Sequence, residues 1–519
     1  MQSTTSPLRP LTADEARAEL ALTLVLPQDR FATAHRFGAT EFERVARWTR
    51  RRGFRISLVD SQTRRVHVYG ETAALASAFG VSLQRFSGTD ATGRTVVFRG
   101  HSGAVELPAE LCGAVDGVFG LDDRPLARPH LRAASAPALV SYDPGELADV
   151  YAFPRLRNGG AGMHLVAGMI ELGGIARARD IAAAFARMKL PAPQLINVSV
   201  DTALPRADPD GADVEVALDY QVLGGIVLQM APRARLTIVV YNAPNHERGF
   251  IDAVATAATD RLHRPAAVSI SWGAPENAWT SQAMRAMNAA FAVGASRGVA
   301  FSASAGDWGS SNAEPDGLQH AEHPASSPHV WACGGTTLLA SRGRVMSETV
   351  WNGLGTQQGA AGSGVSSFFR SPAYQTLNGI EPRSANDGRI GRGLPDASGN
   401  ADPLTGWNVL VGGTLRTTGG TSAVAPMYAA LWTLVGALTQ RRVGSPHDVL
   451  YRAGARCFRD VTRGDTGGPY RARAGWDAAS GWGSPIGTRI AHQLGRGITG
   501  GRPARGRRRD AGDRSLHLM

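Results

Sequence analysis

Several features are scarce in this chain of 519 residues, and cysteine is the first. Three cysteines are too few for a disulfide framework. Cys112 lies in an N-terminal segment discussed below, so only Cys333 and Cys457 remain to pair, and nothing in the sequence indicates that they meet. No run of roughly 18 or more apolar residues occurs, which argues against a spanning helix and a membrane partner. The first twenty residues also lack a basic region followed by an apolar one, so no secretory signal is visible.

Lysine is almost absent, since Lys189 stands alone beside 54 arginines. The net charge of +11 is therefore typical of a GC-rich coding bias rather than of selection for nucleic-acid binding. Aromatic residues make up only 7%, and no stripe of basic and aromatic residues occurs, so we expect no nucleic-acid partner. The basic, glycine-rich tail 500–519 is expected to be disordered and solvated, with contact to an acidic surface as the alternative.

The length and composition predict more than one domain. Apolar residues reach 43% and glycines number 62, which indicates large cores joined by many turns. After an N-terminal extension at 1–19, residues 20–132 combine an apolar run, the helix-like ATEFERVARWTRRRG and the alternating FRISLVDSQTRRVHVYG. This pattern predicts a small α+β unit. A linker rich in small residues follows at 133–141, and a larger domain extends over 142–499.

The larger domain contains short strand-like runs that alternate with helical stretches. Such alternation predicts a parallel, doubly wound α/β sheet. The runs are HLVAGMIE, LTIVVYNA, AAVSISWG, GVAFSASAG and HVWACGG.

A serine on a glycine-rich turn is the first candidate catalytic residue, as a nucleophile. Gly419–Pro426 reads GGTSAVAP and precedes the apolar run MYAALWTLVGAL, which predicts a buried helix that starts near Ser422. Glycines allow the backbone to approach a substrate, and a helix N-terminus favours negative charge that develops beside it. The alternative is an ordinary turn before a helix, because such turns are common.

A serine nucleophile needs a base, and no histidine here stands in a His-Gly-Thr context of the subtilisin type. The carboxylates are better placed. Residues 210–232 predict a helix in which Glu215 and Asp219, four positions apart, share one face. Two such acids share a proton through the acidic range, and one can act as a general base at low pH. The alternative is a solvated acidic face.

Asp307 is a third candidate carboxylate. The run VAFSASAGDWGSS (299–311) predicts a strand that ends in a turn, which would put Asp307 at the carboxyl edge of the sheet. A buried aspartic acid that stays protonated can donate a hydrogen bond to an oxyanion. The alternative is a turn aspartate that binds its own backbone.

Taken in order, these three segments resemble the kumamolisin-like members of the sedolisin family of serine-carboxyl peptidases. The likeness covers nearly the whole chain and is very specific. Its motifs are Glu-x-x-x-Asp at Glu215, SAGDWG, GGTSAVAP, MIELGG, SISWGAPE, HPASSPHVWACGGTTL, ETVWNG, GSGVSSFF and RGLPDASGNADPLTGW.

The resemblance implies a subtilisin-like fold and an acid-active serine endopeptidase that cleaves proteins or peptides through an acyl-enzyme. It implies a triad in which Ser422 is the nucleophile, Glu215 its general base and Asp219 the group that orients Glu215. An acid optimum also follows from the residue types, because Glu215 must be ionised while the oxyanion acid stays neutral.

The remaining site residues are implied in the same way. Asp307 matches the acid that stabilises the oxyanion, while Glu171 and Trp272 match residues that extend the hydrogen-bond network. For Glu171 the alternative is a surface residue at a strand end, and for Trp272 a simple core residue.

The resemblance names residues 20–132 an activation prodomain that inhibits its own enzyme, with processing expected in the linker 133–141. Release in acid would follow if arginines of the TRRRG helix lost ionic contacts as carboxylates of the partner domain become protonated. The alternative for most of these arginines is a solvated helical face.

A C-terminal loop is implied to hold one structural calcium ion. Calcium prefers six to eight oxygen ligands, backbone carbonyls included. Arg473 stands where the family usually has glycine, and the alternative is a turn held by Asx hydrogen bonds. The matching positions are Asp460, Val461, Arg473, Gly475 and Asp477.

Two other functions compete with this interpretation. A neutral subtilisin-like protease would need a catalytic histidine, and an inactive homologue used as a binding module would be expected to lose one of the four catalytic residues. We expect a monomer that acts outside the cell, after export by an unrecognised route, from an earlier start codon, or after release on lysis.

Overall fold

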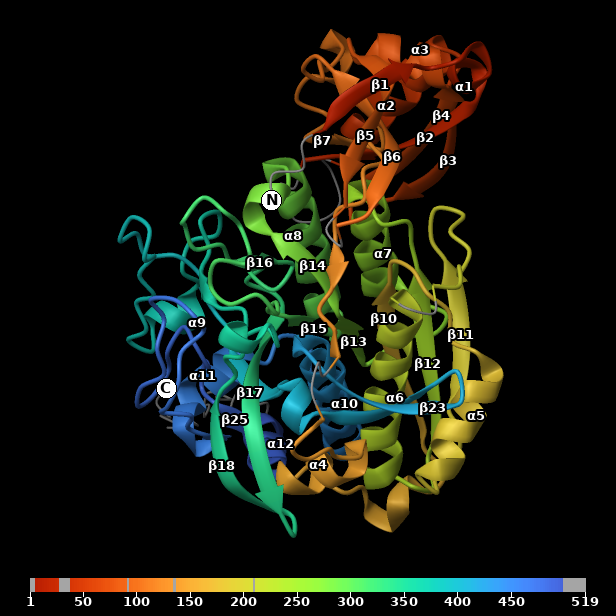
Figure 1. Ribbon diagram of the computed structural model, residues 1–519. Coiled ribbons are helices and arrows are strands. Elements are labelled where there is room, and N and C mark those ends of the chain that lie inside the picture. The colour runs from red at the N-terminus through yellow and green to blue at the C-terminus, as the bar shows by residue number, and fades with distance from the viewer. Residues whose placement is uncertain (1–4, 28–37, 91–92, 134–136, 209–210, 498–519) are drawn as a thin grey trace, which may run out of the picture.

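A sheet of eight strands forms the centre of the larger domain (Figure 1). The computed structural model describes residues 5–27, 38–90, 93–133, 137–208 and 211–497. Seven strands follow the order β11–β12–β10–β13–β15–β17–β18, and β21 also pairs with β17. Their bounds are β10 His164–Glu171, β11 Gln194–Ser199, β12 Arg235–Asn242, β13 Ala267–Ile270, β15 Ala300–Ser304, β17 Trp331–Ser341, β18 Arg344–Val350 and β21 Ala397–Asn400.

The strands of this sheet are parallel except for β18, which runs antiparallel to β17. Its interior strands are buried on both faces, which is why they consist mostly of apolar and small residues and show no polar alternation. All five runs predicted as strands occur in this sheet, although AAVSISWG is divided between β13 and β14 (Trp272–Pro275). The predicted doubly wound α/β architecture is confirmed.

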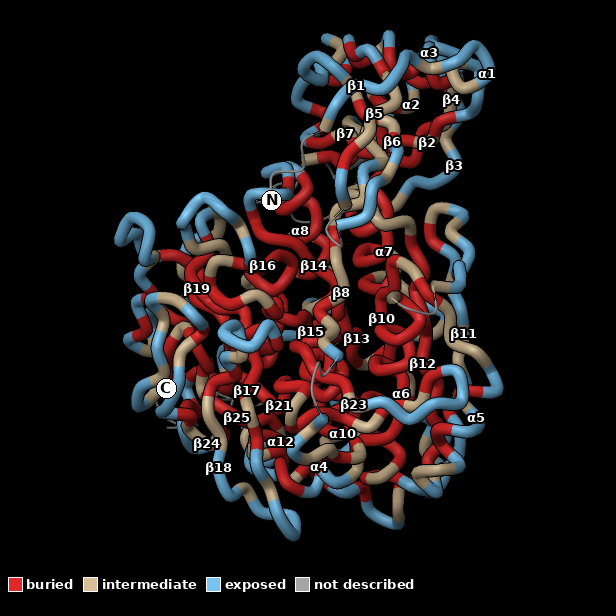
Figure 2. Tube along the Cα trace, viewed as in Figure 1, coloured by how far each residue is buried: buried red, intermediate tan, exposed pale blue. Residues whose placement is uncertain are grey.

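Helices cover both faces of the sheet. The helices α4 (Pro144–Val150), α5 (Ala178–Arg187), α6 (Ala212–Met230), α10 (Val424–Thr439) and α12 (Gly487–Gly497) contribute to one hydrophobic core. The helices α7 (Glu247–Thr259) and α8 (Ser281–Ser296) contribute to a second core. Figure 2 shows α6 and most of α10 as buried chain, whereas the outer side of α5 is exposed. The helix predicted at 210–232 is α6; residue 210 lies outside the described residues, and every residue of α6 except Gln229 is buried.

The helical segment Thr421–Thr439 is long and apolar enough to cross a membrane by length and composition. However, 83% of its most apolar window is buried inside the fold, where α10 packs against α6, β13 and β15. Its apolar character is therefore explained by its place in the core.

The N-terminal unit has its own core around Leu22, Trp48, Val68 and Phe79. Two sheets, β3–β4–β2–β7 and β1–β5–β6, build it together with short helices. The elements are β1 Ser6–Pro10, α1 Ala13–Arg17, β2 Glu19–Val25, α2 Gly38–Arg51, β3 Arg55–Asp60, β4 Arg65–Glu71, α3 Thr72–Ala78, β5 Ser82–Thr89, β6 Thr95–Ser102 and β7 Gly117–Phe119. The separate extension predicted at 1–19 is wrong for residues 6–19, because β1 pairs with β5 and Glu19 begins β2.

A buried charge cluster joins the N-terminal unit to α7. The carboxylate of Asp252 pairs with Arg65, lies 3.2 Å from Nε2 of His67 and accepts a hydrogen bond from the Thr23 hydroxyl at 2.6 Å. Burial opposes ionisation, but Arg65 and His67 hold the pKa of Asp252 below its usual value. Arg50–Arg52 of the TRRRG segment are exposed, which agrees with the solvated-face alternative.

An extended segment, residues 128–133, connects the two parts and is called the crossing segment below. Its first part is β8 (Arg128–Pro129), which pairs with β14, and its last is β9 (Arg132–Ala133), which pairs with β23 (Thr414–Gly419). Residues 134–136 of the predicted linker and the predicted tail 500–519 lie outside the described residues. The remaining short strands are β16 Glu322–His323, β19 Gly364–Val365, β20 Gly393–Leu394, β22 Trp407–Val411, β24 Phe458–Arg459 and β25 Ser484–Pro485, and the remaining helices are α9 Ala373–Thr376 and α11 His447–Ala453.

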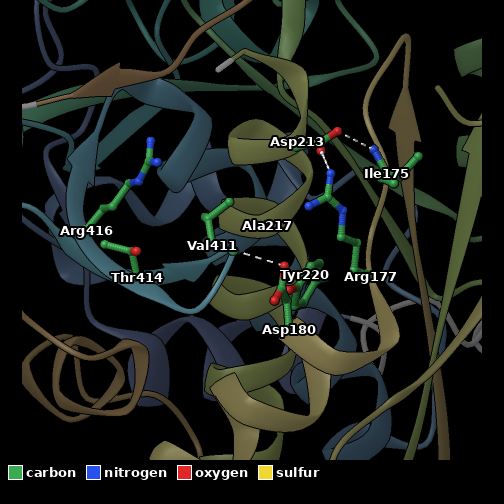
Figure 3. A pocket seen from close by; sticks show the side chains of 10 residues that line it. Ile175, Arg177, Asp180, Asp213, Ala217, Tyr220, Val411, Thr414 and Arg416 are labelled. Atoms are coloured by element: carbon green, nitrogen blue, oxygen red, sulfur yellow. Dashed lines mark hydrogen bonds and ion pairs between the residues drawn. The ribbon is translucent and has the colours of Figure 1, made fainter. Parts of the chain in front are cut away.

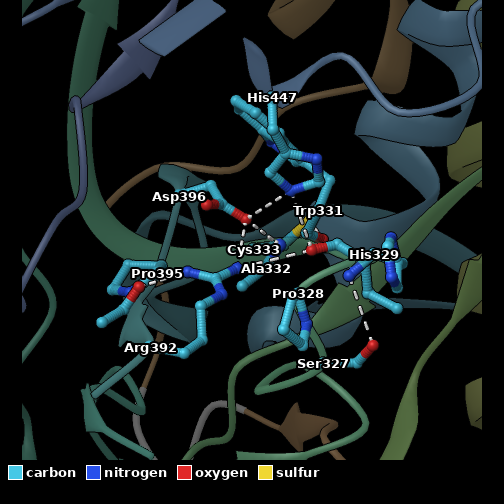
Figure 4. A network of polar contacts seen from close by, with 12 residues as sticks. Ser327, Pro328, His329, Trp331, Ala332, Cys333, Arg392, Pro395, Asp396 and His447 are labelled. Atoms are coloured by element: carbon cyan, nitrogen blue, oxygen red, sulfur yellow. Dashed lines mark hydrogen bonds and ion pairs between the residues drawn. The ribbon is translucent and has the colours of Figure 1, made fainter. Parts of the chain in front are cut away.

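A buried ion pair ties the RGLPDASGN segment to β17 (Figure 4). The Arg392 guanidinium lies 2.7 Å from Asp396, whose carboxylate also accepts the Ala332 N–H at 2.7 Å and lies 3.3 Å from Nε2 of His447. Burial works against the charge, yet Arg392 and His447 lower the pKa of Asp396 to about 2.

The cysteines are free. Cys333 and Cys457 are both buried without forming a disulfide, and Cys112 is exposed. The pairing that the sequence left open is therefore not made.

Candidate active site

Ser422 lies in a short 3₁₀ turn, Thr421–Ala423, directly before α10. Gly420 has φ 95°, and a Cβ there would lie 2.1 Å from the carbonyl oxygen of His130, so this position requires glycine. The Ser422 side chain is buried in the intact chain, and its hydroxyl donates to the Ser271 carbonyl at 3.3 Å. The sequence-predicted arrangement, a serine on a glycine turn that opens a buried helix, is present.

Glu215 and Asp219 lie one turn apart on α6 and are fully buried, so the alternative of a solvated acidic face is wrong. The Ser271 hydroxyl donates to Asp219 at 2.7 Å and also lies 3.3 Å from the Ser422 carbonyl oxygen. Among the described residues, neither carboxylate oxygen of Glu215 has a hydrogen-bond partner.

The electrostatics of this pair follow from burial. Burial and the Asp219 charge raise the pKa of Glu215 well above its usual value, whereas the nearby Ser422 hydroxyl lowers it. Burial likewise raises the pKa of Asp219, and the Ser271 hydrogen bond partly offsets this. The two acids are therefore strongly coupled and hold protons between them.

Glu171 and Trp272 extend the group of buried carboxyls. The Trp272 indole N–H donates to Glu171 at 2.9 Å, and Glu171 is only 1% exposed at the end of β10. Burial and the charge of Asp219 raise the pKa of Glu171 well above its usual value. Glu171 is thus not a surface residue, and Trp272 is both a core residue and a hydrogen-bond donor.

Asp307 follows β15, and its carboxylate accepts hydrogen bonds from Thr421, which is distant in the sequence, rather than from its own turn. One carboxylate oxygen accepts hydrogen bonds from the Thr421 N–H and the Thr421 hydroxyl, each at 2.8 Å. The other oxygen has no hydrogen-bond partner among the described residues and lies 2.5 Å from the point where a Gly420 Cβ would sit. The His130 carbonyl oxygen is 2.1 Å from that same point, so the acid faces this carbonyl. Burial raises the pKa of Asp307, while His130, Arg132 and the Thr421 donors lower it.

The six predicted residues converge because parallel strands end at one edge of the sheet. Glu171 ends β10, Trp272 comes shortly after β13, and Asp307 comes shortly after β15. Ser271 and Thr421 connect these residues but were not singled out from the sequence. Their roles depend on partners far along the chain, and the only local signal was their position within SISWG and GGTSA.

The first turn of α6 is anchored to the segment that follows Glu171 (Figure 3). Asp213 accepts the Ile175 N–H and a guanidinium N–H of Arg177, each at 2.9 Å. A Cβ on Gly174 would lie 2.4 Å from the Ala212 carbonyl oxygen, so the two backbones touch. A cavity of about 110 Å³ adjoins these contacts and is lined also by Asp180, Tyr220 and Arg416. The contacts fix the helix that carries Glu215 against the strand that carries Glu171.

The crossing segment contacts the backbone of Ser271 and Ser422 directly. The His130 N–H donates to the Ser271 carbonyl at 3.0 Å, and the Ser422 N–H donates to the His130 carbonyl at 3.0 Å. Strands pair on both sides of this point, Pro129 with Trp272 and Arg132 with Gly419. The Ser422 N–H thus points at a carbonyl that lies beside the buried Asp307 carboxyl.

The His130 side chain is fully buried. Its Nδ1 lies 2.6 Å from the Ser304 hydroxyl and its Nε2 2.7 Å from a carboxylate oxygen of Glu322, which is itself fully buried. A Cβ on Gly273 would lie 2.9 Å from the His130 ring, so glycine there makes room for it. Glu322 was not identified from the sequence, because nothing near it marks it as a partner of residue 130.

The C-terminal loop brings the five predicted calcium ligands together. Asp477 accepts the Arg473 N–H at 2.8 Å, and Asp460 accepts the Gly475 N–H at 2.9 Å. The second oxygen of Asp460 is buried and has no hydrogen-bond partner among the described residues, so it could act as a metal ligand. Arg473 has no positive φ, so an arginine at this position does not strain the loop.

Comparisons with known proteins agree with this geometry. Residues 25–124 match the family model described as the pro-kumamolisin activation domain. Kumamolisin from Bacillus sp. (strain MN-32) is 40% identical over 488 residues, which cover 90% of this chain and 86% of the relative. This chain is a serine-carboxyl peptidase of the sedolisin family.

Other sedolisins support the same assignment. Sedolisin from Pseudomonas sp. (strain 101) is 28% identical over 448 residues, or 80% of this chain and 72% of the relative. A solved structure of Pseudomonas sedolisin, a serine-carboxyl proteinase complexed with pseudo-iodotyrostatin, has a TM-score of 0.60 and 26% identity. It covers 69% of this chain and 99% of that chain. The sedolisin described here therefore has a subtilisin-like catalytic fold and an N-terminal prodomain, as the motifs implied.

Proposed function

We propose that the chain is a zymogen that processes itself into an acid-active serine endopeptidase with a Ser422–Glu215–Asp219 triad. The observation that carries the proposal is the hydrogen bond of 3.0 Å from the Ser422 N–H to the His130 carbonyl. A peptide bond held in this way has its carbonyl carbon beside the serine and its oxygen beside Asp307. Protein and peptide substrates would bind in the same place once the prodomain has left.

The proposed reaction begins when the Ser422 oxygen bonds to the carbonyl carbon and its proton passes to Glu215. The carbonyl electron pair moves onto oxygen, where the Ser422 N–H and protonated Asp307 stabilise it, at roughly 3–4 kcal/mol for each donor. The C–N bond then breaks, the leaving amine takes the proton from Glu215, and an acyl-enzyme remains. Water gives a proton to Glu215, attacks the acyl carbon and releases the acid, while Ser422 regains its proton.

Acid conditions are part of the proposal, because Asp307 must be neutral while one charge resides on Glu215. Burial raises the pKa of Asp307, so its protonated form persists in acid and is lost as pH rises. Glu171, Asp219 and Glu215 share their protons, and the first proton leaves such a group at lower pH than the later ones. Burial raises the pKa of both Glu215 and Asp219, while the Ser422 hydroxyl lowers that of Glu215 and the Ser271 hydroxyl that of Asp219. The proposal requires the single charge to reside on Glu215 when the Ser422 hydroxyl attacks.

Self-processing would cut the bond between His130 and Leu131. This bond is N-terminal to the linker 133–141, where the sequence alone favoured processing. Support comes from the extended pairing of the crossing segment with β14 and β23, which is how peptide substrates often add to a protease. Until the cut, the N-terminal unit and the crossing segment up to His130 would act as an intramolecular inhibitor by filling the site, in place of the residues 20–132 expected from the sequence. The buried Glu322 carboxylate would favour histidine or another basic residue before the scissile bond.

We also propose one structural calcium ion in the C-terminal loop. The donor set is entirely oxygen, which suits calcium, and the unpartnered Asp460 oxygen would gain a ligand. The ion would tie the loop together and supply no step of the reaction. Its ligands would be Asp460, Asp477 and the carbonyl oxygens of Val461, Arg473 and Gly475.

The competing functions have weaker support. A neutral subtilisin-like protease would need an imidazole on the Ser422 hydroxyl, yet the His130 ring is engaged by Ser304 and Glu322. An inactive binding module would not need the Ser422 N–H and the Asp307 carboxyl to meet at one carbonyl. A monomer that works outside the cell remains our proposal, because acid surroundings are found there.

The test compares the purified full chain with its Ser422→Ala form after a shift to about pH 4, where a coupled carboxylate base is poised. Intact mass is followed over time, and an unfolded protein is then added as substrate. We expect only the wild type to lose residues 1–130 and to digest the added protein. If both forms stay intact and inert from acid to neutral pH, the inactive homologue is correct, and processing that peaks near neutral pH would indicate a histidine base.

A further inference from the structure

Trp308 contacts two arginines of the crossing segment. Its ring centre lies 3.5 Å from the guanidinium carbon of Arg132 and 5.3 Å from that of Arg128. Arg128 precedes His130 by two residues and Arg132 follows it by two, so the arginines flank the bond between His130 and Leu131. One aromatic ring therefore contacts the chain on both sides of that bond.

Both guanidinium groups also have polar partners. Arg132 donates to the Asp307 carbonyl oxygen at 3.1 Å, and Arg128 donates to the carbonyl and side-chain oxygens of Asn312 at 3.0 and 2.5 Å. Gly359 has φ 87°, and a Cβ there would lie 2.9 Å from Nε of Arg132. Nε of Arg132 also lies 3.8 Å from a carboxylate oxygen of Asp307. The place that Arg132 occupies is thus formed by the Trp308 ring, the carbonyl and carboxylate of Asp307, and a glycine that leaves space.

The ring is held by the same turn that holds the oxyanion acid. Trp308 directly follows Asp307, and the turn is fixed by backbone hydrogen bonds from Ala360 to Asp307 at 3.1 Å and from Gly309 to Ala360 at 3.0 Å. The ring is only partly buried, so it remains available to a substrate after the crossing segment has left.

We propose that Trp308 is a specificity-determining residue that recognises arginine in protein substrates, mainly at the second position after the scissile bond. Arginine at the third position before that bond is recognised more weakly, because Arg128 is farther from the ring. Guanidinium groups stack on indole rings better than the compact lysine ammonium. The inference rests on the proposed function and adds the substrate class, basic sequences of the form Arg-x-His-x-Arg.

The test uses the acid-activated full chain and two internally quenched peptides. One carries the native ARPHLRAA sequence, and the other has alanine in place of the arginine after leucine. For wild type, kcat/KM should favour the arginine peptide by about 5- to 30-fold, the range of a partly desolvated cation–π contact. Trp308→Ala should reduce this preference to less than about twofold, and Trp308→Phe, which keeps a ring, should retain most of it. A peptide with lysine there should fall between the two.

Two outcomes would overturn the inference without touching the proposed function. The first is equal cleavage of both peptides by wild type. The second is an undiminished arginine preference in Trp308→Ala, which would assign recognition to the carbonyl and carboxylate of Asp307 instead. A binding measurement separates the two proposals. Ser422→Ala chain, freed of its prodomain by a trace of wild type, is titrated with fluorescent forms of the same peptides.

Arginine-selective binding by Ser422→Ala, lost when Trp308→Ala is added, would uphold the inference even if Ser422 proved unnecessary for cleavage. Cleavage by Ser422→Ala at the wild-type rate would overturn the proposed function alone. Equal binding of both peptides by Ser422→Ala would overturn the inference alone.

Discussion

Replacing Asp307 with asparagine tests the acid beside the oxyanion most directly. One carboxylate oxygen of Asp307 accepts two hydrogen bonds from Thr421, so an asparagine keeps its amide oxygen there. The amide NH₂ then takes the place of the second oxygen, which faces the His130 carbonyl. The variant thus has a hydrogen-bond donor at every pH, whereas wild type has one only while Asp307 is protonated.

The magnitudes follow from the loss or retention of that donor. Asp307→Ala removes it and should lower kcat by about 10²- to 10³-fold. Asp307→Asn should stay within about tenfold of wild type in acid, because a neutral donor remains. Burial raises the pKa of Asp307, so wild-type activity declines as pH rises through that pKa, and the asparagine variant should lack this decline.

The assay is the initial rate of peptide cleavage from about pH 3 to about pH 7, for wild type and both variants after acid activation. Catalytically silent zymogens are activated by a trace of wild type, so that failure to process is not mistaken for failure to react. The reasoning is refuted if Asp307→Asn shows the same decline at high pH as wild type. It is also refuted if the asparagine and alanine variants are equally slow in acid.

Three further predictions concern stability. The raised pKa values of Glu215 and Asp219 mean that these two acids bind protons more tightly in the folded than in the unfolded chain, so their contribution to the free energy of unfolding should fall as pH rises above about 4. In urea denaturation the difference in stability between wild type and Glu215→Gln should therefore change with pH in favour of the variant as pH rises, and a difference that does not depend on pH would contradict the burial argument. Asp396→Asn should destabilise by about 3–5 kcal/mol, because it leaves Arg392 buried without its counter-charge. The loss should be similar near pH 4 and near pH 7, since the pKa of Asp396 is about 2, and a loss confined to neutral pH would count against the assignment. A calcium chelator should lower the midpoint of thermal unfolding in wild type but hardly in Asp460→Ala. Equal shifts of the midpoint in both proteins would contradict the proposed calcium site.

Much of the fold was predictable because its signals are local. The runs from HLVAGMIE to HVWACGG are apolar and bounded by turn residues, and each forms a strand of the sheet. Helix α6 also has a local signal. Glu215 and Asp219 stand in a segment that is apolar on nearly all sides, which is typical of a buried helix. This composition favours burial of the two acids over a solvated acidic face.

Other features depend on partners that are distant in the sequence. Residues 6–10 have no strand pattern of their own and become β1 only because β5 lies beside them. The hydroxyl of Ser271 acquires its role by reaching Asp219, 52 residues away. Likewise, the small residues after Ala133 suggested an exposed processing site, whereas the crossing segment owes its position to β14 and β23. Contacts between segments so far apart in the sequence cannot be predicted from the local residue pattern.

The hydrogen bond from Ser422 to the His130 carbonyl has a consequence for what happens after the proposed cut. In the intact chain, the group that lies beside the buried acids is the neutral peptide bond after His130, and its carbonyl accepts a hydrogen bond from the Ser422 N–H. Hydrolysis would leave a free carboxylate at His130, beside Glu215 and Asp307. The single charge that the proposal places on Glu215 would repel this new carboxylate, so a severed prodomain should bind less well than the intact one. Under the proposed mechanism, breaking one bond would therefore weaken the inhibitor and disfavour its return to the site.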